Sequence, residues 1–61
     1  MKKEHAIIIK AISDLLVAHP ELRFGQALFN LNINQFYPDG SEPRDIFYDT
    51  DEIIVKRLRK I

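Results

Sequence analysis

The two histidines of this 61-residue chain, His5 and His19, are the side chains best suited to proton transfer or metal binding at neutral pH. They lie 14 residues apart, and neither belongs to a His-Glu-x-x-His sequence, which places two zinc ligands on one face of a helix. The chain has no Cys, so it offers no thiolate ligand for zinc and no disulfide. His19 precedes Pro20, and we expect it to cap a junction between two helices. The sequence therefore predicts no metal site and no catalytic base.

The other groups that serve in catalysis or ion binding lack the neighbours that such chemistry needs. Ser13 and Ser41 lie in no nucleophile-elbow sequence and have no base beside them. Gly25 and Gly40 form no phosphate-binding loop. The acid-rich segment lacks the Asp-x-Asp-x-Asp-Gly order and the twelfth-position Glu of an EF-hand calcium loop. We therefore expect a protein that is not an enzyme, uses no cofactor and acts by binding another protein.

The charges are distributed unevenly, although the formal net charge is zero. Residues 39–52 carry six acids against the single base Arg44, a net charge of −5, whereas residues 53–61 carry four bases and no acid, a net charge of +4. One interpretation is structural, because acids stabilise the N-terminus of a helix and bases its C-terminus. The other is an acidic face that binds a basic surface, such as that of a nucleic-acid-handling protein. That face comprises Asp39, Glu42, Asp45, Asp49, Asp51 and Glu52.

The bases near the C-terminus raise the alternative of a nucleic-acid-associated accessory protein. Four cations close together on one helix can contact phosphates. The zero net charge and the neighbouring acids oppose direct binding, and the sequence has neither zinc-finger spacing nor the glycine turn of a helix-turn-helix motif. This role is therefore our second hypothesis. The residues concerned are Lys56, Arg57, Arg59 and Lys60.

A helix is predicted over residues 3–18. Ile8, Ile12 and Leu15 share one face at helical spacing. The run of three isoleucines that contains Ile8 also suits a strand, but the length of the apolar pattern favours a helix. Pro20 forces its neighbour out of the α region, so this helix should end near residue 18.

A second helix is predicted to begin at Pro20, because proline is well tolerated at the first helical position, and to reach about Leu31. This segment is apolar on most sides, which indicates burial against more than one surface. Gly25, within it, is either a harmless weak point or a site where another helix approaches closely. We expect a homodimer, with an interface formed by Phe24, Gly25, Leu28 and Leu31.

Turn-forming residues then predict a loop from about Asn32 to Arg44, with Phe36 and Tyr37 packed on the core. A short extended piece follows. Asp49 fits the N-cap of a third helix that continues to the C-terminus. The expected fold is all-α: one domain over residues 1–61, with three short helices, a long loop and an extended segment before the last helix.

Size gives an independent reason to expect self-association. The chain is 46% hydrophobic and 30% charged, a globular composition, but its core is small. Domains this short usually need disulfides, a metal or oligomerisation, and only the last remains here. The sequence has no apolar run of about 18 residues that would span a membrane and no signal-peptide core, so we expect a cytoplasmic protein.

Two stretches resemble a family of very short uncharacterised proteins from bacteria and their phages. The first is His-Pro-Glu-Leu-Arg-Phe-Gly-Gln-Ala-Leu-Phe-Asn-Leu at residues 19–31, and the second is Asp-Ile-Phe-Tyr-Asp-Thr-Asp-Glu at residues 45–52. The resemblance covers roughly residues 15–58 and implies no particular mechanism. In size and character the chain is also similar to small phage inhibitors of the Hachiman defence system, a helicase–nuclease system. The similarity implies an anti-defence factor that binds and blocks a host protein.

Arg23 lies at the centre of the first stretch and has two interpretations. As a structural residue, it would pair with the acids between Asp45 and Glu52 and so tie the second helix to the third. As a contact residue, it would belong to a target-binding surface. We expect the structural role, together with a structural role for Pro20. The sequence predicts a phage- or prophage-type protein that inhibits or adapts a host protein, or failing that a purely structural oligomer.

Overall fold

The computed structural model describes residues 1–59, and all regular secondary structure in that range is helical. Helix α1 spans Lys3–Ala18, α2 spans Phe24–Asn30 and α3 spans Asp51–Arg57. The predicted all-α class is therefore confirmed. None of these helices combines the length and the hydropathy of a membrane-spanning segment.

Helix α1 has the predicted bounds, and its C-terminus ends as the His-Pro pair requires. The backbone N–H of His19 donates to the carbonyl of Leu15 at 2.9 Å, which closes the last turn. His19 itself has φ −134° and ψ 72°, outside the helical region, because Pro20 excludes the α conformation from the preceding residue. The predicted capping role of His19 is confirmed.

Helix α2 is shorter than predicted, because it begins at Phe24 instead of Pro20. Pro20 lies in a turn in which the N–H of Leu22 donates to the carbonyl of His19 at 3.1 Å. Arg23 is the N-cap and has an extended backbone, and its N–H donates to Oε1 of Gln26 at 2.9 Å. A Gln three residues after the N-cap provides one half of a capping box. The Arg-Phe-Gly-Gln sequence thus starts the helix at Phe24.

The C-terminus of α2 is a Schellman motif that directs the chain back into the core. Asn32 has φ +69°, the left-handed conformation that asparagine tolerates better than most residues. Its N–H donates to the carbonyl of Phe29, and the N–H of Ile33 donates to the carbonyl of Leu28, both at 3.0 Å. This reversal places Ile33 among the buried residues.

Helix α3 begins one residue later than predicted and stops before the described part of the chain ends. Its N-cap is Thr50, whose Oγ1 accepts from the N–H of Ile53 at 3.3 Å, and not Asp49. It ends at Arg57, whereas a helix to the C-terminus was predicted. Leu58 is non-helical, and the N–H of Arg59 donates to the carbonyl of Leu31 at 3.0 Å. Because Leu31 is the C-cap residue of α2, this bond directs the chain toward α2 and ends helix α3.

We expect Thr50→Ala to lower the free energy of unfolding by about 1 kcal/mol, because the first turn of α3 then loses its side-chain acceptor. Urea denaturation followed by circular dichroism measures this change. Thr50→Ser keeps the hydroxyl and is the matched control. Equal midpoints for the Ala and Ser variants would show that the cap contributes nothing to stability.

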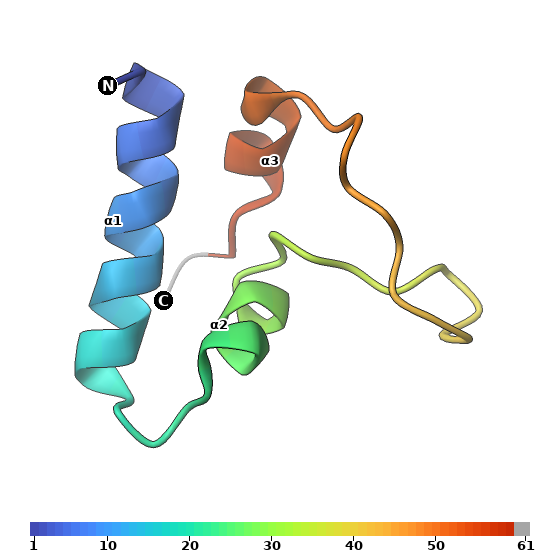
Figure 1. The fold of residues 1–61 in the computed structure, drawn as a ribbon, viewed down its shortest axis with the longest axis horizontal. Helices are drawn as coiled ribbons and strands as arrows, with labels where there is room; N and C mark the ends of the chain where they lie inside the picture. Colours follow the sequence, from blue (N-terminus) through green and yellow to red (C-terminus); the bar gives the residue numbers. More distant parts are fainter. Residues whose placement is uncertain (60–61) are drawn as a thin grey trace.

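The core is small and is supplied by all three helices and the chain after α2. Its fully buried members are Leu15 from α1, Ala27 from α2, and Leu31 and Ile33 from the Schellman turn. Figure 1 shows α3 beside the N-terminal half of α1 and α2 beside its C-terminal half. Partly buried apolar side chains surround this core, and they are Ile8, Ala11, Ile12, Leu16, Leu22, Leu28, Ile46, Ile54 and Leu58.

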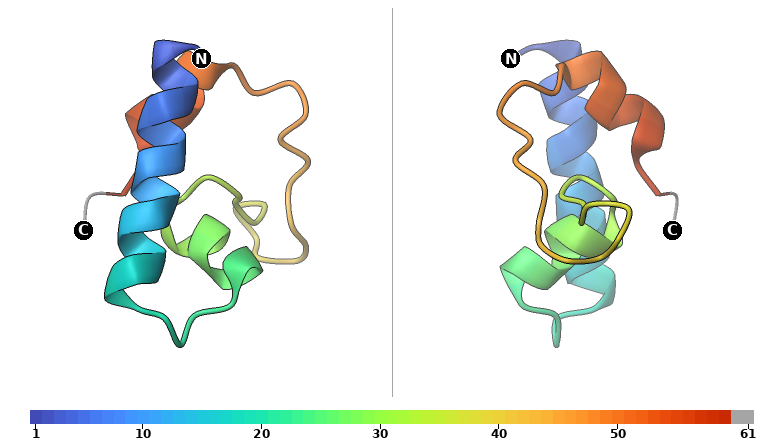
Figure 2. Two further views of the ribbon diagram at one scale, coloured as in Figure 1. Left: turned by 60° about the vertical axis from the view of Figure 1, so that its left-hand side comes forward. Right: turned by 90° about the vertical axis from the view of Figure 1, so that its right-hand side faces the viewer.

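The segment between α2 and α3 forms a wide loop away from the helices (Figures 1 and 2). Part of it pairs like a hairpin, with a bridge between Phe36 and Pro43 and a bond from the N–H of Arg44 to the carbonyl of Gln35 at 2.7 Å. Phe36 stacks on Phe29 with ring centroids 4.7 Å apart, which joins the loop to α2. The prediction that Phe36 and Tyr37 pack on the core is wrong, because they are 54% and 41% exposed and neither is among the side chains that pack against the buried cluster.

This loop makes the molecule flat. Its extents are 31 × 29 × 16 Å, and its radius of gyration is 11.8 Å. A compact chain of this length has a radius of gyration of about 10.5 Å. The flat shape leaves apolar side chains of the helices and the loop exposed.

Candidate partner-binding surface

Asp49 is the centre of an ion-pair cluster beneath the loop. Its Oδ2 lies 2.7 Å from Nη2 of Arg44 and 2.7 Å from Nη1 of Arg57, and its Oδ1 accepts from Nη1 of Arg44 at 3.3 Å. The Asp49 side chain is only 15% exposed and that of Arg57 only 13% exposed. A carboxylate held by two guanidinium groups has little freedom to move. The cluster therefore fixes the backbone at residue 49 to both the hairpin and α3.

Arg57 extends this cluster to the end of α2. Its Nε donates to the carbonyl of Asn32 at 2.8 Å and its Nη2 to the carbonyl of Ile33 at 2.5 Å. In return, the side-chain amide of Asn32 donates to the carbonyl of Arg57 at 3.3 Å. One side chain thus connects α3, the Schellman turn and the segment that contains Asp49. The assignment of Arg57 to nucleic-acid contact is wrong, because its guanidinium is committed to these internal partners.

The other residues of the predicted basic group are placed differently. Lys56 and Arg59 are exposed, whereas Lys60 lies outside the described residues. With Arg57 turned inward, the exposed part of the group within residues 1–59 is reduced to these two side chains. The structure therefore weakens the case for a continuous basic surface on α3.

Arg23 does not hold the position that the sequence predicted for it. Its side chain is exposed, and within residues 1–59 it forms no ion pair with the acids between Asp45 and Glu52. Arg44 and Arg57 supply the cations that pair with Asp49 instead. The prediction failed because α2 begins at Phe24, which leaves Arg23 in the turn outside the helix. The pairing of Asp49 with Arg44 and Arg57 has one signal in the sequence, which is the presence of a base on either side of Asp49.

The predicted acidic face separates into exposed and paired residues. Asp49 is inside the cluster just described, and Asp51 connects α3 to α1 through Nζ of Lys2 at 2.7 Å and Nε2 of His5 at 3.0 Å. Lys2, and then the charge of His5, hold the pKa of Asp51 below its usual value. The remaining four acids are exposed, and they are Asp39, Glu42, Asp45 and Glu52.

The turn of residues 45–49, which we call the aromatic turn, lies among the exposed and the paired acids, where the sequence predicted an extended segment. Oδ1 of Asp45 accepts from the N–H of Phe47 at 2.9 Å, and the N–H of Asp49 donates to the carbonyl of Ile46 at 3.0 Å. Ile46 packs against the core. Phe47 and Tyr48 are 78% and 89% exposed. Both ends of the turn are thus anchored while its two rings project into solvent.

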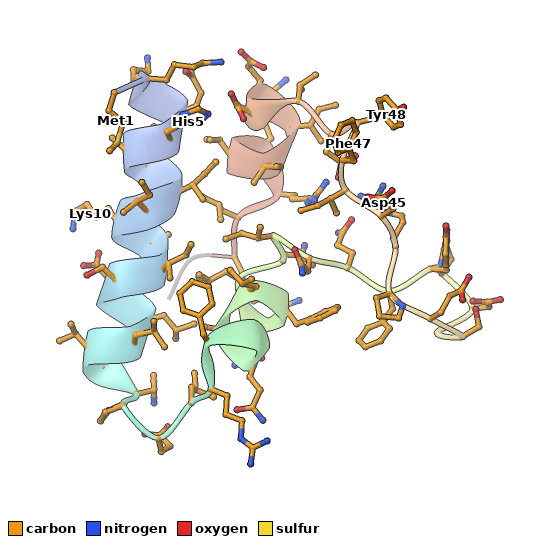
Figure 3. The ribbon with its side chains drawn as sticks, in the orientation of Figure 1. Met1, His5, Lys10, Asp45, Phe47 and Tyr48 are labelled. Carbon is orange, nitrogen blue, oxygen red and sulfur yellow. The ribbon has the colours of Figure 1, made fainter. Side chains whose placement is uncertain are left out.

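The two rings form a single projecting unit. Their centroids are 5.0 Å apart with an interplanar angle of 78°, the edge-to-face arrangement that aromatic pairs favour. Figure 3 shows both side chains on the part of the molecule that faces away from α1, with Asp45 beside them. Sequence reasoning assigned these rings no role, although the pair Phe-Tyr within an acidic segment was the available signal.

Asp49 should make stability depend on pH. Arg44, and then Arg57, hold its pKa below the ordinary value of 3.8. A lowered pKa in the folded state stabilises the protein above the unfolded-state pKa, and this contribution is lost as pH falls through the folded-state pKa. We expect the thermal midpoint of the wild type to fall more steeply below about pH 4 than that of Asp49→Asn. The exposed Glu52→Gln is the control, and a slope for Asp49→Asn equal to the wild type would contradict the assignment.

The residues predicted for the dimer interface do not share one surface. Leu31 is 1% exposed and belongs to the core of its own chain, so its assignment to the interface is corrected. Leu28 is half-buried in the same core. Among residues 1–59, no atom outside the local backbone of α2 and the two chain neighbours lies within 4 Å of the place where a side chain on Gly25 would begin, so no other helix of the same chain approaches it closely. Phe24 is exposed and borders a groove on α1.

Within residues 1–59, no three His, Asp or Glu side chains gather in a group that could hold a metal ion. The geometry is that of an anchored aromatic projection with exposed acids near it, an arrangement that can bind the surface of a partner. Comparison of the chain with protein-family models, with curated proteins and with solved structures gives no match.

Proposed function

We propose that the protein is a non-enzymatic binding protein whose aromatic turn inserts into an apolar pocket of a host protein and so inhibits or adapts it. The observation that supports this proposal is the pair Phe47 and Tyr48, exposed on a turn that the Asp49 cluster holds in place. Tyrosine is among the residues that contribute most to protein interfaces, and a projecting ring desolvates well in a pocket. A turn that is already ordered loses little conformational entropy on binding.

The acids near the turn indicate the charge of the partner. Asp45 belongs to the turn, Glu52 lies in the first turn of α3, and both are exposed. A pocket with a basic rim would complement them and would increase both the association rate and the selectivity. Proteins that handle nucleic acids carry such basic surfaces. The resemblance to short phage proteins makes a cytoplasmic defence protein of this kind the first candidate class.

We also propose that the protein acts as a homodimer, since residues 1–59 contain four buried apolar side chains and therefore little core of their own. Two copies would present two aromatic turns. Simultaneous attachment of both to an oligomeric target would strengthen binding without any new contact.

The partner can be identified by affinity capture from host lysate in parallel with wild type and with the Phe47→Ala/Tyr48→Ala double variant. The expected result is one or a few proteins retained by wild type and absent from the variant at equal bait loading. Proteins retained equally by both would not use the aromatic turn. If the wild-type bait retains no protein other than further copies of the same chain, the protein is a structural oligomer and the proposal is wrong.

A further inference from the structure

Helix α1 has a second apolar face, which lies beside the core on the side toward α2. Its exposed members include Ile9 at 51%, Val17 at 79% and, across from them on α2, Phe24 at 60%. Ile12 and Leu16 lie between these residues and the core and are half-buried. Together with Ser13 these side chains line one open groove along α1, which we call the α1 groove.

Among residues 1–59, no charged side chain lines the α1 groove. Lys10 and Asp14, four residues apart on α1, pair with each other at 2.8 Å. Single exposed apolar residues are normal on a protein surface, but a contiguous apolar groove of this kind usually marks a contact site. We therefore expect an apolar surface of another molecule to pack against the groove.

The exposed area of the chain indicates that the cover is large. The chain exposes 4740 Å². A folded monomer of 7.2 kDa exposes about 4100 Å², so the excess is about 600 Å². A standard protein–protein interface buries about 800 Å² on each partner. A dimer interface of ordinary size on α1 would therefore remove about as much area as this chain exposes in excess.

The residues of the groove fit a second copy of the same chain. Ile9, Ser13 and Val17 follow one another at intervals of four, so they form one straight row on the surface of α1. The small Ser13 is at the centre of this row, with a large apolar residue on each side. A two-fold axis through Ser13 would place Ile9 of each copy against Val17 of the other and let the two helices approach closely.

We infer that a second copy covers the α1 groove, with the two α1 helices antiparallel across a two-fold axis at Ser13; this rests on the proposed homodimer and specifies its surface. The antiparallel arrangement sets the N-terminus of each helix dipole near the C-terminus of the other. A parallel pair would instead bring the two N-termini together, along with Lys2 and Lys3 of both copies.

The inferred interface leaves the aromatic turn free. The side chains that line the α1 groove come from α1 and α2, and none of them belongs to the aromatic turn. In Figure 3, Phe47 and Tyr48 project on the side of the molecule away from α1. Self-association and partner binding then use separate surfaces of each subunit.

Single cysteines test the register, because the natural chain has none. We expect Ser13→Cys to form a disulfide-linked dimer quickly under mild oxidation. We also expect a mixture of Ile9→Cys and Val17→Cys to form the mixed disulfide faster than either variant alone. In the antiparallel pair two copies of position 9 lie about 12 Å apart along the helix axis, beyond the reach of about 7 Å between the Cα atoms of a disulfide. Ala18→Cys, exposed on the same helix but outside the groove, is the control.

A charge at the axis tests the same interface without cysteine. Ser13→Arg sets two like charges against each other and should raise the Kd of the dimer by about a hundredfold, whereas Ala18→Arg should leave it unchanged. Sedimentation equilibrium measures both. A wild-type dimer in which Ser13→Cys oxidises no faster than Ala18→Cys would overturn this interface and leave the homodimer standing. A wild type that stays monomeric at high micromolar concentration would overturn both.

Discussion

Replacement of Arg57 by Met is expected to lower the midpoint of thermal unfolding by more than about 10 °C, since the loss of about 3 kcal/mol is large for a domain of this size. Arg57 is 13% exposed and donates to the carbonyls of Asn32 and Ile33 while pairing with Asp49. Met fills a similar volume but leaves two carbonyls without their donor, and of the two guanidinium groups at Asp49 only that of Arg44 remains. The penalty for leaving such groups unpaired exceeds the net value of the bonds themselves.

The control for this experiment is the neighbouring residue of the same helix. Lys56 is exposed, so Lys56→Met removes a positive charge from α3 without removing an internal partner, and its midpoint should stay within a few degrees of wild type. Arg57→Lys should recover only part of the loss, because an ammonium group cannot reach three acceptors in the planar geometry of a guanidinium. Similar midpoints for Arg57→Met and Lys56→Met would refute the bridging role of Arg57.

The second large effect is expected on partner binding. Once the partner has been identified by capture, the Phe47→Ala/Tyr48→Ala variant should bind it with a Kd raised by about a hundredfold or more, since each central aromatic residue of an interface contributes about 2 kcal/mol or more. The thermal midpoint should hardly change, because the two rings are 78% and 89% exposed and contribute little to the core. Calorimetric titration and thermal unfolding of the same samples measure the two quantities.

Tyr37→Ala provides a matched aromatic truncation elsewhere on the loop. Tyr37 is exposed in the hairpin-like part of the segment between α2 and α3, outside the aromatic turn. Its truncation should change the Kd much less than the double substitution. If Tyr37→Ala weakens binding as strongly, the contact surface is the whole loop and not the aromatic turn. If neither changes the Kd, the partner binds elsewhere.

Helix α1 shows what local sequence signals can determine. Apolar residues at helical spacing predicted its body, and the restriction that Pro20 places on His19 predicted its end. Both signals act over a few residues and need no other part of the chain. The all-α class was predictable for the same reason. The start of α2 was predicted wrongly because two local signals compete. Pro20 suits the first position of a helix, whereas Gln26 suits the third position after an N-cap, and the sequence does not determine which signal prevails.

The Asp49 cluster shows what only the tertiary structure decided. Asn32 and Arg57 are 25 residues apart, and their pairing depends on how α3 packs beside the end of α2. The charges of residues 39–60 look alike in the sequence, yet folding leaves the side chains of Asp49 and Arg57 only 15% and 13% exposed, whereas Asp45 and Lys56 are exposed. The same packing turns Leu31 inward and leaves Ile9, Val17 and Phe24 outside. Residue type fixes the charge or hydrophobicity of a side chain, but the burial of that side chain depends on contacts between distant segments. These contacts therefore determine which residues remain on the surface, where a partner can bind them.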